Sequence, residues 1–119
     1  MPYEVTRRFE GALCEYTGAK YAVAVNSGTA ALLLALRWCW CCLQMGDPFF
    51  VRLPSRTYVS VPQAAMHAGF EVVFEPMQWS VEYQIWPTKV WDSARRFTSG
   101  MYRAGLFQCV SFAAAKILG

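Results

Sequence analysis

Apolar residues recur at helical spacing near the start of the chain and form continuous runs further along. Residues 4–16 repeat apolar positions every three or four residues, which predicts an amphipathic helix that ends at Gly18. The run YAVAV at 21–25 is bounded by turn residues and predicts a short buried strand. The stretch from 29 to about 43 is apolar except for Arg37 and predicts a buried helix. The apolar face of the first helix consists of Val5, Phe9, Leu13 and Tyr16.

The middle of the chain alternates between strand and helix patterns. A turn at 45–48 leads to a predicted strand at 49–54, a helix at 57–69 that Gly69 ends, and a strand at 70–76. Strands that alternate with helices are typical of a parallel sheet with helical crossovers, so the predicted fold class is α/β. The remaining pattern predicts an aromatic loop at 77–88 and a short strand at 89–92. A short helix or loop at 93–105 and a last strand at 106–112 follow.

Size and composition indicate one domain at most, and one that associates with further protein surface. The chain has 119 residues, of which 55% are apolar and 16% aromatic, more than a domain of this size buries by itself. We therefore expect a homodimer or contact with more chain. The net charge of +3 comes without a basic stripe, which does not favour a nucleic-acid partner. The apolar run at 29–43 is too short to cross a bilayer comfortably, so no membrane association is expected.

The five cysteines do not indicate a metal site. Cys39 and Cys42 form a CxxC pair, but the chain has no second pair and no histidine nearby, which argues against zinc. Without a recognisable signal peptide, these cysteines are interpreted as small apolar core residues in a reducing compartment. The expected location is the cytoplasm.

A strand, a glycine turn and a helix start follow one another at NSGTAAL. A helix N-terminus presents free backbone N–H groups and the positive end of the helix dipole, which together suit a phosphate. Gly28 would allow close approach, and the hydroxyls of Ser27 and Thr29 would add hydrogen bonds. Taken alone, the motif favours a plain helix N-cap.

Two further polar groups follow predicted strands. Asp92 ends KVWD, where a carboxylate either begins a turn or faces a cationic ring nitrogen. Ser111 and Lys116 follow the last strand, and a lysine there is either a surface cation or an amine made nucleophilic by burial. The carboxyl ends of parallel strands meet at the ligand-binding edge of an open α/β sheet. A phosphate cradle, an acid and a lysine in this order suggest pyridoxal 5'-phosphate (PLP).

The sequence also resembles the DegT family of PLP-dependent sugar-nucleotide aminotransferases. The resemblance rests on FEGALCEYTGAKYAVAVNSGTAALLLAL, LPSRTYVSVPQAAMHAGFEVVFEP, DSARRF and CVSFAAAK, which together cover most of the chain. It implies a three-layer α/β/α large domain of the aspartate-aminotransferase type with a mostly parallel sheet. It also implies transfer of an amino group, with glutamate as the expected donor, to a nucleotide-linked keto-sugar, by a dimer.

The resemblance assigns roles to individual residues. Gly28 and Thr29 would hold the phosphate with help from Ser27 and Ser111, and Tyr58 would stack on the cofactor ring. Three further positions complete the implied set: Asp92 would bind the ring nitrogen, Arg95 would lie near the ring hydroxyl, and Lys116 would bond to the cofactor as a Schiff base.

The chain departs from the family pattern at several points. Arg95 stands where most members have Gln or His, and Ala113 stands where most have His. Between FEP and KVWD most members carry a further strand and helix, and the chain stops at Gly119. We therefore interpret residues 1–119 as an incomplete large domain. Two alternatives remain open, an inactive remnant or binding module that keeps the fold, and a PLP-dependent lyase or dehydratase. Lys116 argues against the dehydratase branch, which replaces this lysine.

Overall fold

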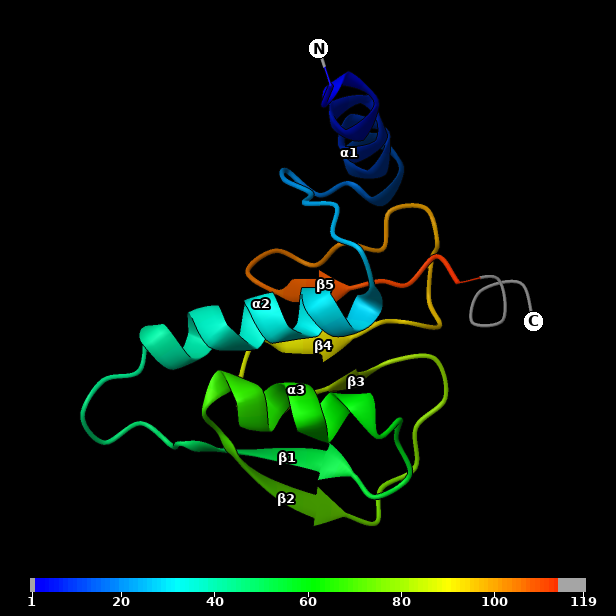
Figure 1. The fold of residues 1–119 in the computed structure, drawn as a ribbon. Coiled ribbons are helices and arrows are strands. Elements are labelled where there is room, and N and C mark those ends of the chain that lie inside the picture. The colour runs from blue at the N-terminus through cyan, green and yellow to red at the C-terminus, as the bar shows by residue number, and fades with distance from the viewer. Residues whose placement is uncertain (1, 114–119) are drawn as a thin grey trace.

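The computed structural model describes residues 2–113. Two helices come first, helix and strand alternate from residue 28 to residue 75, and three further strands follow (Figure 1). The helices are α1 (Glu4–Thr17), α2 (Gly28–Cys41) and α3 (Ser60–Ala68). The strands are β1 (Phe50–Pro54), β2 (Glu71–Glu75), β3 (Tyr83–Gln84), β4 (Val90–Asp92) and β5 (Phe107–Cys109).

The strands form a parallel pair and a three-stranded sheet. β1 pairs with β2 in parallel and β4 pairs with β5 in parallel, whereas β3 is antiparallel to β4. The backbone N–H of Arg52 donates to the carbonyl of Trp86 at 2.7 Å, and this isolated antiparallel bridge joins the two groups of strands. The spatial order is therefore β2, β1, β3, β4, β5, as Figure 1 shows.

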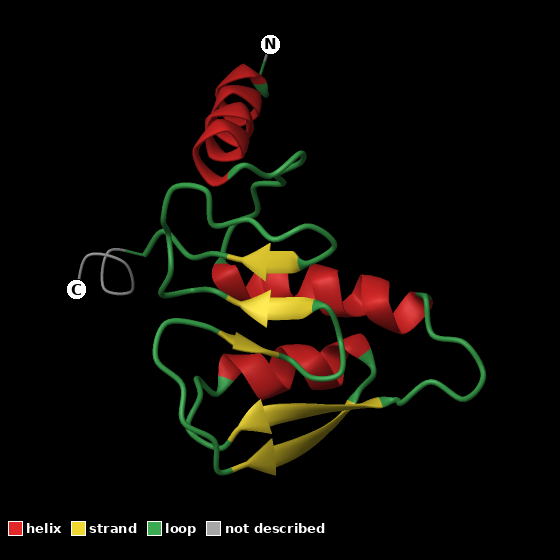
Figure 2. Ribbon diagram, turned by 180° about the vertical axis from the view of Figure 1, so that it is seen from behind, coloured by secondary structure: helices red, strands yellow, loops and turns green. Residues whose placement is uncertain are grey.

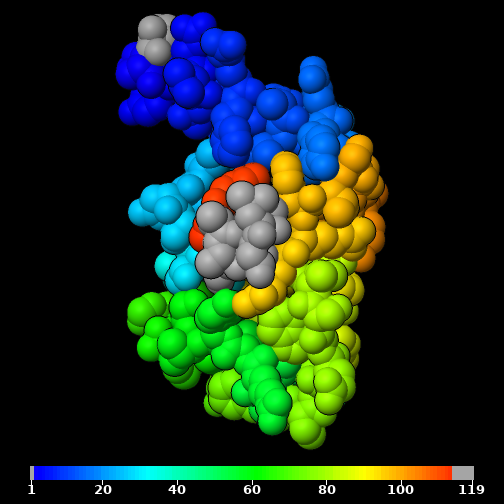
Figure 3. All heavy atoms as spheres, turned by 90° about the vertical axis from the view of Figure 1, so that its right-hand side faces the viewer, coloured from blue at the N-terminus to red at the C-terminus, as the bar shows by residue number. Residues whose placement is uncertain are grey.

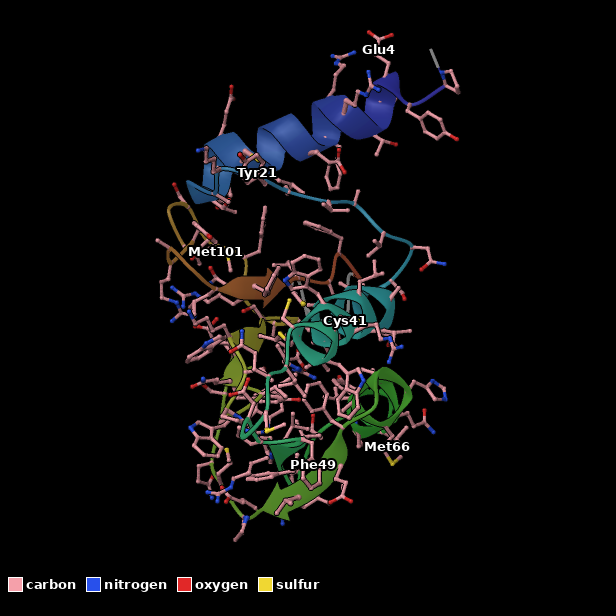
Figure 4. All side chains as sticks on the ribbon, turned by 90° about the vertical axis from the view of Figure 1, so that its left-hand side faces the viewer. Glu4, Tyr21, Cys41, Phe49, Met66 and Met101 are labelled. Carbon is pink, nitrogen blue, oxygen red and sulfur yellow. The ribbon has the colours of Figure 1, made fainter. Side chains whose placement is uncertain are left out.

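Helices α2 and α3 cover one face of these strands. The core lies between the two layers, where side chains of α2, α3, β1, β3, β4 and β5 are excluded from water because burying apolar surface is favourable. From behind and along the sheet edge, no helix of residues 2–113 covers the opposite face (Figures 2 and 4). The α/β class is thus confirmed, and two layers of the expected three are present in this range. The fully buried core side chains are Leu36, Val51, Leu53, Ala65, Ala68, Ile85 and Val90.

The predicted helix starts and stops are close to those observed. Ser27 is the N-cap of α2, and its hydroxyl accepts a hydrogen bond from the Ala30 N–H at 3.1 Å. α3 begins three residues later than predicted, with Pro62 in its first turn, where a missing N–H costs little. Gly69 ends α3 in the left-handed conformation at φ 117°.

The predicted strand at 21–25 is wrong. Tyr21 and Val23 are 79% and 76% exposed, and the segment is an extended connection between α1 and α2. A strand forms when its backbone pairs with a neighbour, and no described strand pairs with this segment. The N–H of Ala24 instead donates to the Glu10 carboxylate at 2.7 Å.

Three other sequence predictions need correction. The loop expected at 77–88 contains β3, because a short backbone segment there pairs with β4. The last strand is confined to Phe107–Cys109 rather than running over 106–112. α2 ends at Cys41 and is not buried all round, since Leu34 and Trp38 on its outer side are 58% and 62% exposed.

The predicted amphipathic helix at the start of the chain is confirmed as α1, but none of its residues is buried. It stands off from the body of the molecule, as the space-filling view shows (Figure 3). Aromatic contacts attach it, with Phe9 against Phe112 at 5.3 Å and Tyr16 against Phe97 at 4.8 Å between ring centroids.

Across residues 2–113, none of the helices has the length and apolar character needed to cross a bilayer.

Candidate functional site at the carboxyl ends of β4 and β5

A cavity of about 200 Å³ lies between the N-terminus of α2 and the carboxyl ends of β4 and β5. Six of the predicted site residues line it, although they come from four separate parts of the chain. Lys116 lies outside the described residues. The full lining is Ser27, Gly28, Thr29, Leu32, Tyr58, Ser60, Val61, Asp92, Ala94, Cys109 and Ser111.

The start of α2 is both a helix cap and a source of free donors. Ser27 accepts the Ala30 N–H through its hydroxyl and the Ala31 N–H through its carbonyl. The amides of Gly28 and Thr29 find no hydrogen-bond acceptor among residues 2–113, as is usual for the first turn of a helix. The plain-cap interpretation of the motif is therefore right for Ser27, and two N–H groups remain for an anion.

Gly28 lies directly against Ser111. A Cβ built on Gly28 would stand 3.5 Å from the Ser111 Cβ and 3.9 Å from its hydroxyl oxygen. Ser111 itself is 8% exposed, and its hydroxyl accepts the N–H of Ala113 at 3.3 Å. The absence of a side chain at Gly28 thus keeps this corner of the cavity open beside the two free amides.

Asp92 is buried at the end of β4, with 5% of its surface exposed. Its Oδ1 accepts the N–H of Ala94 at 3.1 Å, which is the turn-forming role expected of an aspartate after a strand. Its Oδ2 accepts the hydroxyl of Tyr83 at 3.0 Å. An ionised carboxylate only accepts hydrogen bonds, so Asp92 is the kind of group that a protonated ligand atom needs as its partner.

Sequence reasoning missed two neighbours of Asp92 and a third residue that contacts one of them. Tyr83 lies opposite Asp92 on β3, and Cys109 lies opposite it on β5. The Thr57 hydroxyl contacts the Tyr83 hydroxyl at 2.5 Å. No periodicity in the aromatic segment marks Tyr83, and only the pairing of β3 with β4 reveals it.

The environment of Asp92 keeps its neighbours protonated. Burial, followed by the negative charge of Asp92, raises the pKa of the Tyr83 phenol well above its ordinary value. Burial first, then Asp92 and Cys39, raises the pKa of the Cys109 thiol to about 12. Both groups are therefore neutral near pH 7, and the phenol is a permanent donor to the carboxylate.

Tyr58 separates the small cavity from a larger hollow. That hollow has a volume of about 780 Å³, and Arg95 lines it rather than the small cavity. The Arg95 Nη2 donates to the Tyr58 hydroxyl at 2.8 Å, and its guanidinium carbon lies 5.8 Å from the centre of the Tyr58 ring. Arg95 thus contacts the predicted site through Tyr58.

The cysteines only partly match the prediction of core residues. Cys109 is buried and Cys39 half-buried, whereas Cys41 and Cys42 are exposed at the end of α2, where Figure 4 labels Cys41. All five thiols are free. Within the described part of the chain, no three side chains of the kinds that ligate metals are grouped together.

One known protein family matches the chain over most of its length. The model of the DegT/DnrJ/EryC1/StrS aminotransferase family matches residues 1–107. The chain belongs to this family. Its members are PLP-dependent aminotransferases.

Two curated relatives of this DegT-family chain come from Campylobacter jejuni, serotypes O:2 and O:23/36. Each is a UDP-4-amino-4,6-dideoxy-N-acetyl-beta-L-altrosamine transaminase, 39% identical over 66 residues. The match covers 56% of this chain and 16% of each relative, so the chain spans only a small part of their length. No solved structure matches the chain significantly.

The residues around the cavity fit PLP. Two unbonded amides and three hydroxyl groups converge near Gly28, which suits a phosphate. Asp92, a buried carboxylate, lines the same cavity as Tyr58, and a carboxylate is the acceptor that suits a protonated ring nitrogen. N–H and O–H donors at one end and a carboxylate acceptor at the other therefore match the charges of the phosphate and of the protonated ring nitrogen.

Proposed function

We propose that this chain is part of a PLP-dependent aminotransferase that acts on a nucleotide-linked keto-sugar, with glutamate as the amino donor. The observation that carries the proposal is the cavity at the carboxyl ends of β4 and β5, on which six predicted site residues converge. Family membership supports the reaction class, and the two transaminase relatives support the substrate class.

Each residue around the cavity has a role in this proposal. The amides of Gly28 and Thr29, with the hydroxyls of Ser27 and Ser111, bind the phosphate. Asp92 binds the ring nitrogen and holds its proton there. Tyr58 covers one face of the cofactor ring. Arg95 lies near the hydroxyl of the cofactor ring and orients Tyr58 through a 2.8 Å hydrogen bond to the Tyr58 hydroxyl.

PLP, when bound, withdraws electrons from the substrate carbon that carries the nitrogen and so makes that carbon acidic. The protein must then supply a base close to this carbon. We assign this role to the Nζ of Lys116, which takes up the proton from the amino donor's α-carbon and later returns it. Burial of Tyr83 and Cys109 excludes water from the far side of Asp92.

We also propose that the chain is part of a three-layer α/β/α large domain and that this domain forms a homodimer. Many large apolar side chains are exposed, and one face of the sheet has no helix over it in residues 2–113. Leu34 and Trp38 on α2 and Val73 and Phe74 on β2 are each at least 43% exposed. Exposed apolar surface of this extent is typical of interfaces.

Covalent mapping tests the cofactor assignment. The full chain is incubated with PLP, reduced with borohydride, digested and analysed by mass spectrometry. We expect the adduct on Lys116, because the phosphate site would hold the aldehyde near this amine at a high effective concentration. A Lys116→Arg variant is the matched control and should lose the adduct.

Two results would contradict the proposal. Label on Lys20 or Lys89 with Lys116 bare would show that the cavity does not direct the aldehyde. Absence of label on every lysine, in a chain that is folded by circular dichroism, would favour a binding module that keeps the fold without the chemistry.

A further inference from the structure

A chain of hydrogen bonds links three elements of the fold behind the candidate site. Thr57, before α3, contacts the Tyr83 hydroxyl at 2.5 Å, and this hydroxyl lies 3.0 Å from the Asp92 Oδ2. Thr57 and Asp92 are 35 positions apart in sequence, and Tyr83 on β3 connects them. Tyr83 is 4% exposed, so this chain is shielded from water.

The direction of the hydrogen bonds follows from the available protons. An ionised carboxylate only accepts, so the single phenolic proton of Tyr83 points to Asp92. The Tyr83 oxygen then accepts the proton of Thr57. Because burial and the Asp92 charge raise the pKa of Tyr83, the phenol keeps this proton through the ordinary pH range.

The fold holds Tyr83 rigidly in this position. Tyr83 and Asp92 are direct partners in the antiparallel pairing of β3 and β4, which places both side chains on one face. The indole of Trp79 packs edge-on against the Tyr83 ring, with 4.8 Å between centroids, and its N–H donates to the Arg56 carbonyl at 2.7 Å. A rotation of the phenol would disrupt these contacts.

The two Asp92 oxygens therefore have different partners. Ala94 holds Oδ1 through a local turn, and Tyr83 holds Oδ2 from another strand. A carboxylate held at only one oxygen turns easily about its terminal torsion, which is broad for aspartate. Hydrogen bonds to both oxygens fix its plane.

We propose that Tyr83, held by Thr57, is a positioning residue that fixes the Asp92 carboxylate for a cationic ring nitrogen in the cavity. This inference rests on the proposed function, because it takes Asp92 as the partner of the PLP ring nitrogen. It adds a residue from the short strand β3, which the sequence did not predict. Loss of the outer partner of a metal ligand typically weakens metal binding about tenfold or more, and we expect an effect of the same order here.

The test measures binding of pyridoxamine 5'-phosphate to the full chain by equilibrium dialysis. This ligand has the ring nitrogen and phosphate but no aldehyde, so reaction with lysines does not contribute. We expect Tyr83→Phe and Thr57→Val each to weaken binding, by about tenfold for Tyr83→Phe. Tyr21→Phe, at a tyrosine that is 79% exposed, is the matched control and should bind like the unmodified chain.

A double-mutant cycle separates positioning from a general structural effect. If Tyr83 acts through Asp92, Tyr83→Phe should have no further effect in an Asp92→Asn background. An analogue with a carbon in place of the ring nitrogen should likewise bind equally to the unmodified chain and to Tyr83→Phe. Circular dichroism checks that each variant is folded.

The outcomes distinguish this inference from the proposed function. If Asp92→Asn weakens binding and folded Tyr83→Phe does not, the positioning role of Tyr83 is wrong and the cofactor site stands. If Tyr83→Phe weakens the nitrogen-free analogue as strongly, its effect is structural and the inference is again wrong. If the unmodified chain does not bind pyridoxamine 5'-phosphate, both proposals fail together.

Discussion

Substitution of Gly28 tests whether the start of α2 is an anion site or only a helix cap. Gly28 is not in the left-handed region, so a side chain there introduces no backbone strain. In Gly28→Ala, the new Cβ stands 3.5 Å from the Ser111 Cβ, an ordinary contact. Since alanine favours helix more than glycine does, we expect stability to be unchanged or to rise by up to about 1 kcal/mol.

Gly28→Val should behave differently. A γ-methyl projects about 1.5 Å beyond Cβ, so one directed at Ser111 would leave only about 2 Å of the 3.5 Å separation. Avoiding this contact restricts the rotamer or displaces Ser111, which costs about 1–3 kcal/mol. The methyls also cover the amides of Gly28 and Thr29. Loss of two hydrogen bonds to a charged group, at about 1.5 kcal/mol or more each, corresponds to at least about a hundredfold weaker binding.

The assay pairs urea denaturation with dialysis of pyridoxamine 5'-phosphate. Gly11→Ala in α1, where nothing lies within 4 Å of the new methyl, controls for the effect of a methyl on a helical glycine. It should leave binding unchanged. A folded Gly28→Val variant that binds as tightly as the unmodified chain would refute the reasoning and reduce the NSGT motif to a cap.

Three further predictions concern stability and association. Gly69→Ala should lower the free energy of unfolding in urea by about 2–5 kcal/mol, because the left-handed φ disfavours a Cβ and that Cβ would lie 2.7 Å from the Trp40 ring. Gly46 is also left-handed but stands in open space, so Gly46→Ala should lower it less. Burial alone would raise the pKa of Glu82, but hydrogen bonds and neighbouring arginines lower it overall. The ionised Glu82 should therefore stabilise the fold above about pH 4.5, and this contribution should be lost as the pH falls further. Glu82→Gln should flatten this pH dependence in thermal melts recorded at several pH values. Trp38→Glu should shift the chain toward monomer in sedimentation velocity, and an unchanged sedimentation coefficient would place the interface elsewhere.

Local patterns in the sequence were enough to predict much of the fold. The 3.6-residue periodicity predicts α1, and Ser27 and Gly69 mark the start of α2 and the end of α3 because capping depends on neighbouring backbone groups alone. The alternation of strands and helices also predicts that β4 and β5 end at one edge. Residues as distant in sequence as Gly28 and Ser111 are therefore predictable neighbours, and both line one cavity.

Features that depend on pairing between distant segments could not be predicted in this way. YAVAV has the composition of a buried strand, yet it pairs with no described strand and Tyr21 is exposed. The opposite error occurs at Tyr83, whose surroundings have no strand pattern but whose backbone pairs with Asp92. Composition indicates whether a segment can form a strand, whereas a strand forms only where another backbone satisfies its N–H and C=O groups.

The sequence by itself determined which residue types surround the candidate site, because a helix cap, a strand-ending acid and a following serine are local features with a shared location in α/β sheets. The tertiary structure alone decided how those residues are held. It directs Arg95 to Tyr58, places Cys109 beside Asp92 and brings the Thr57–Tyr83 chain to the carboxylate. Such contacts join segments that are far apart along the chain, and their geometry follows from packing and strand register, which no local pattern encodes.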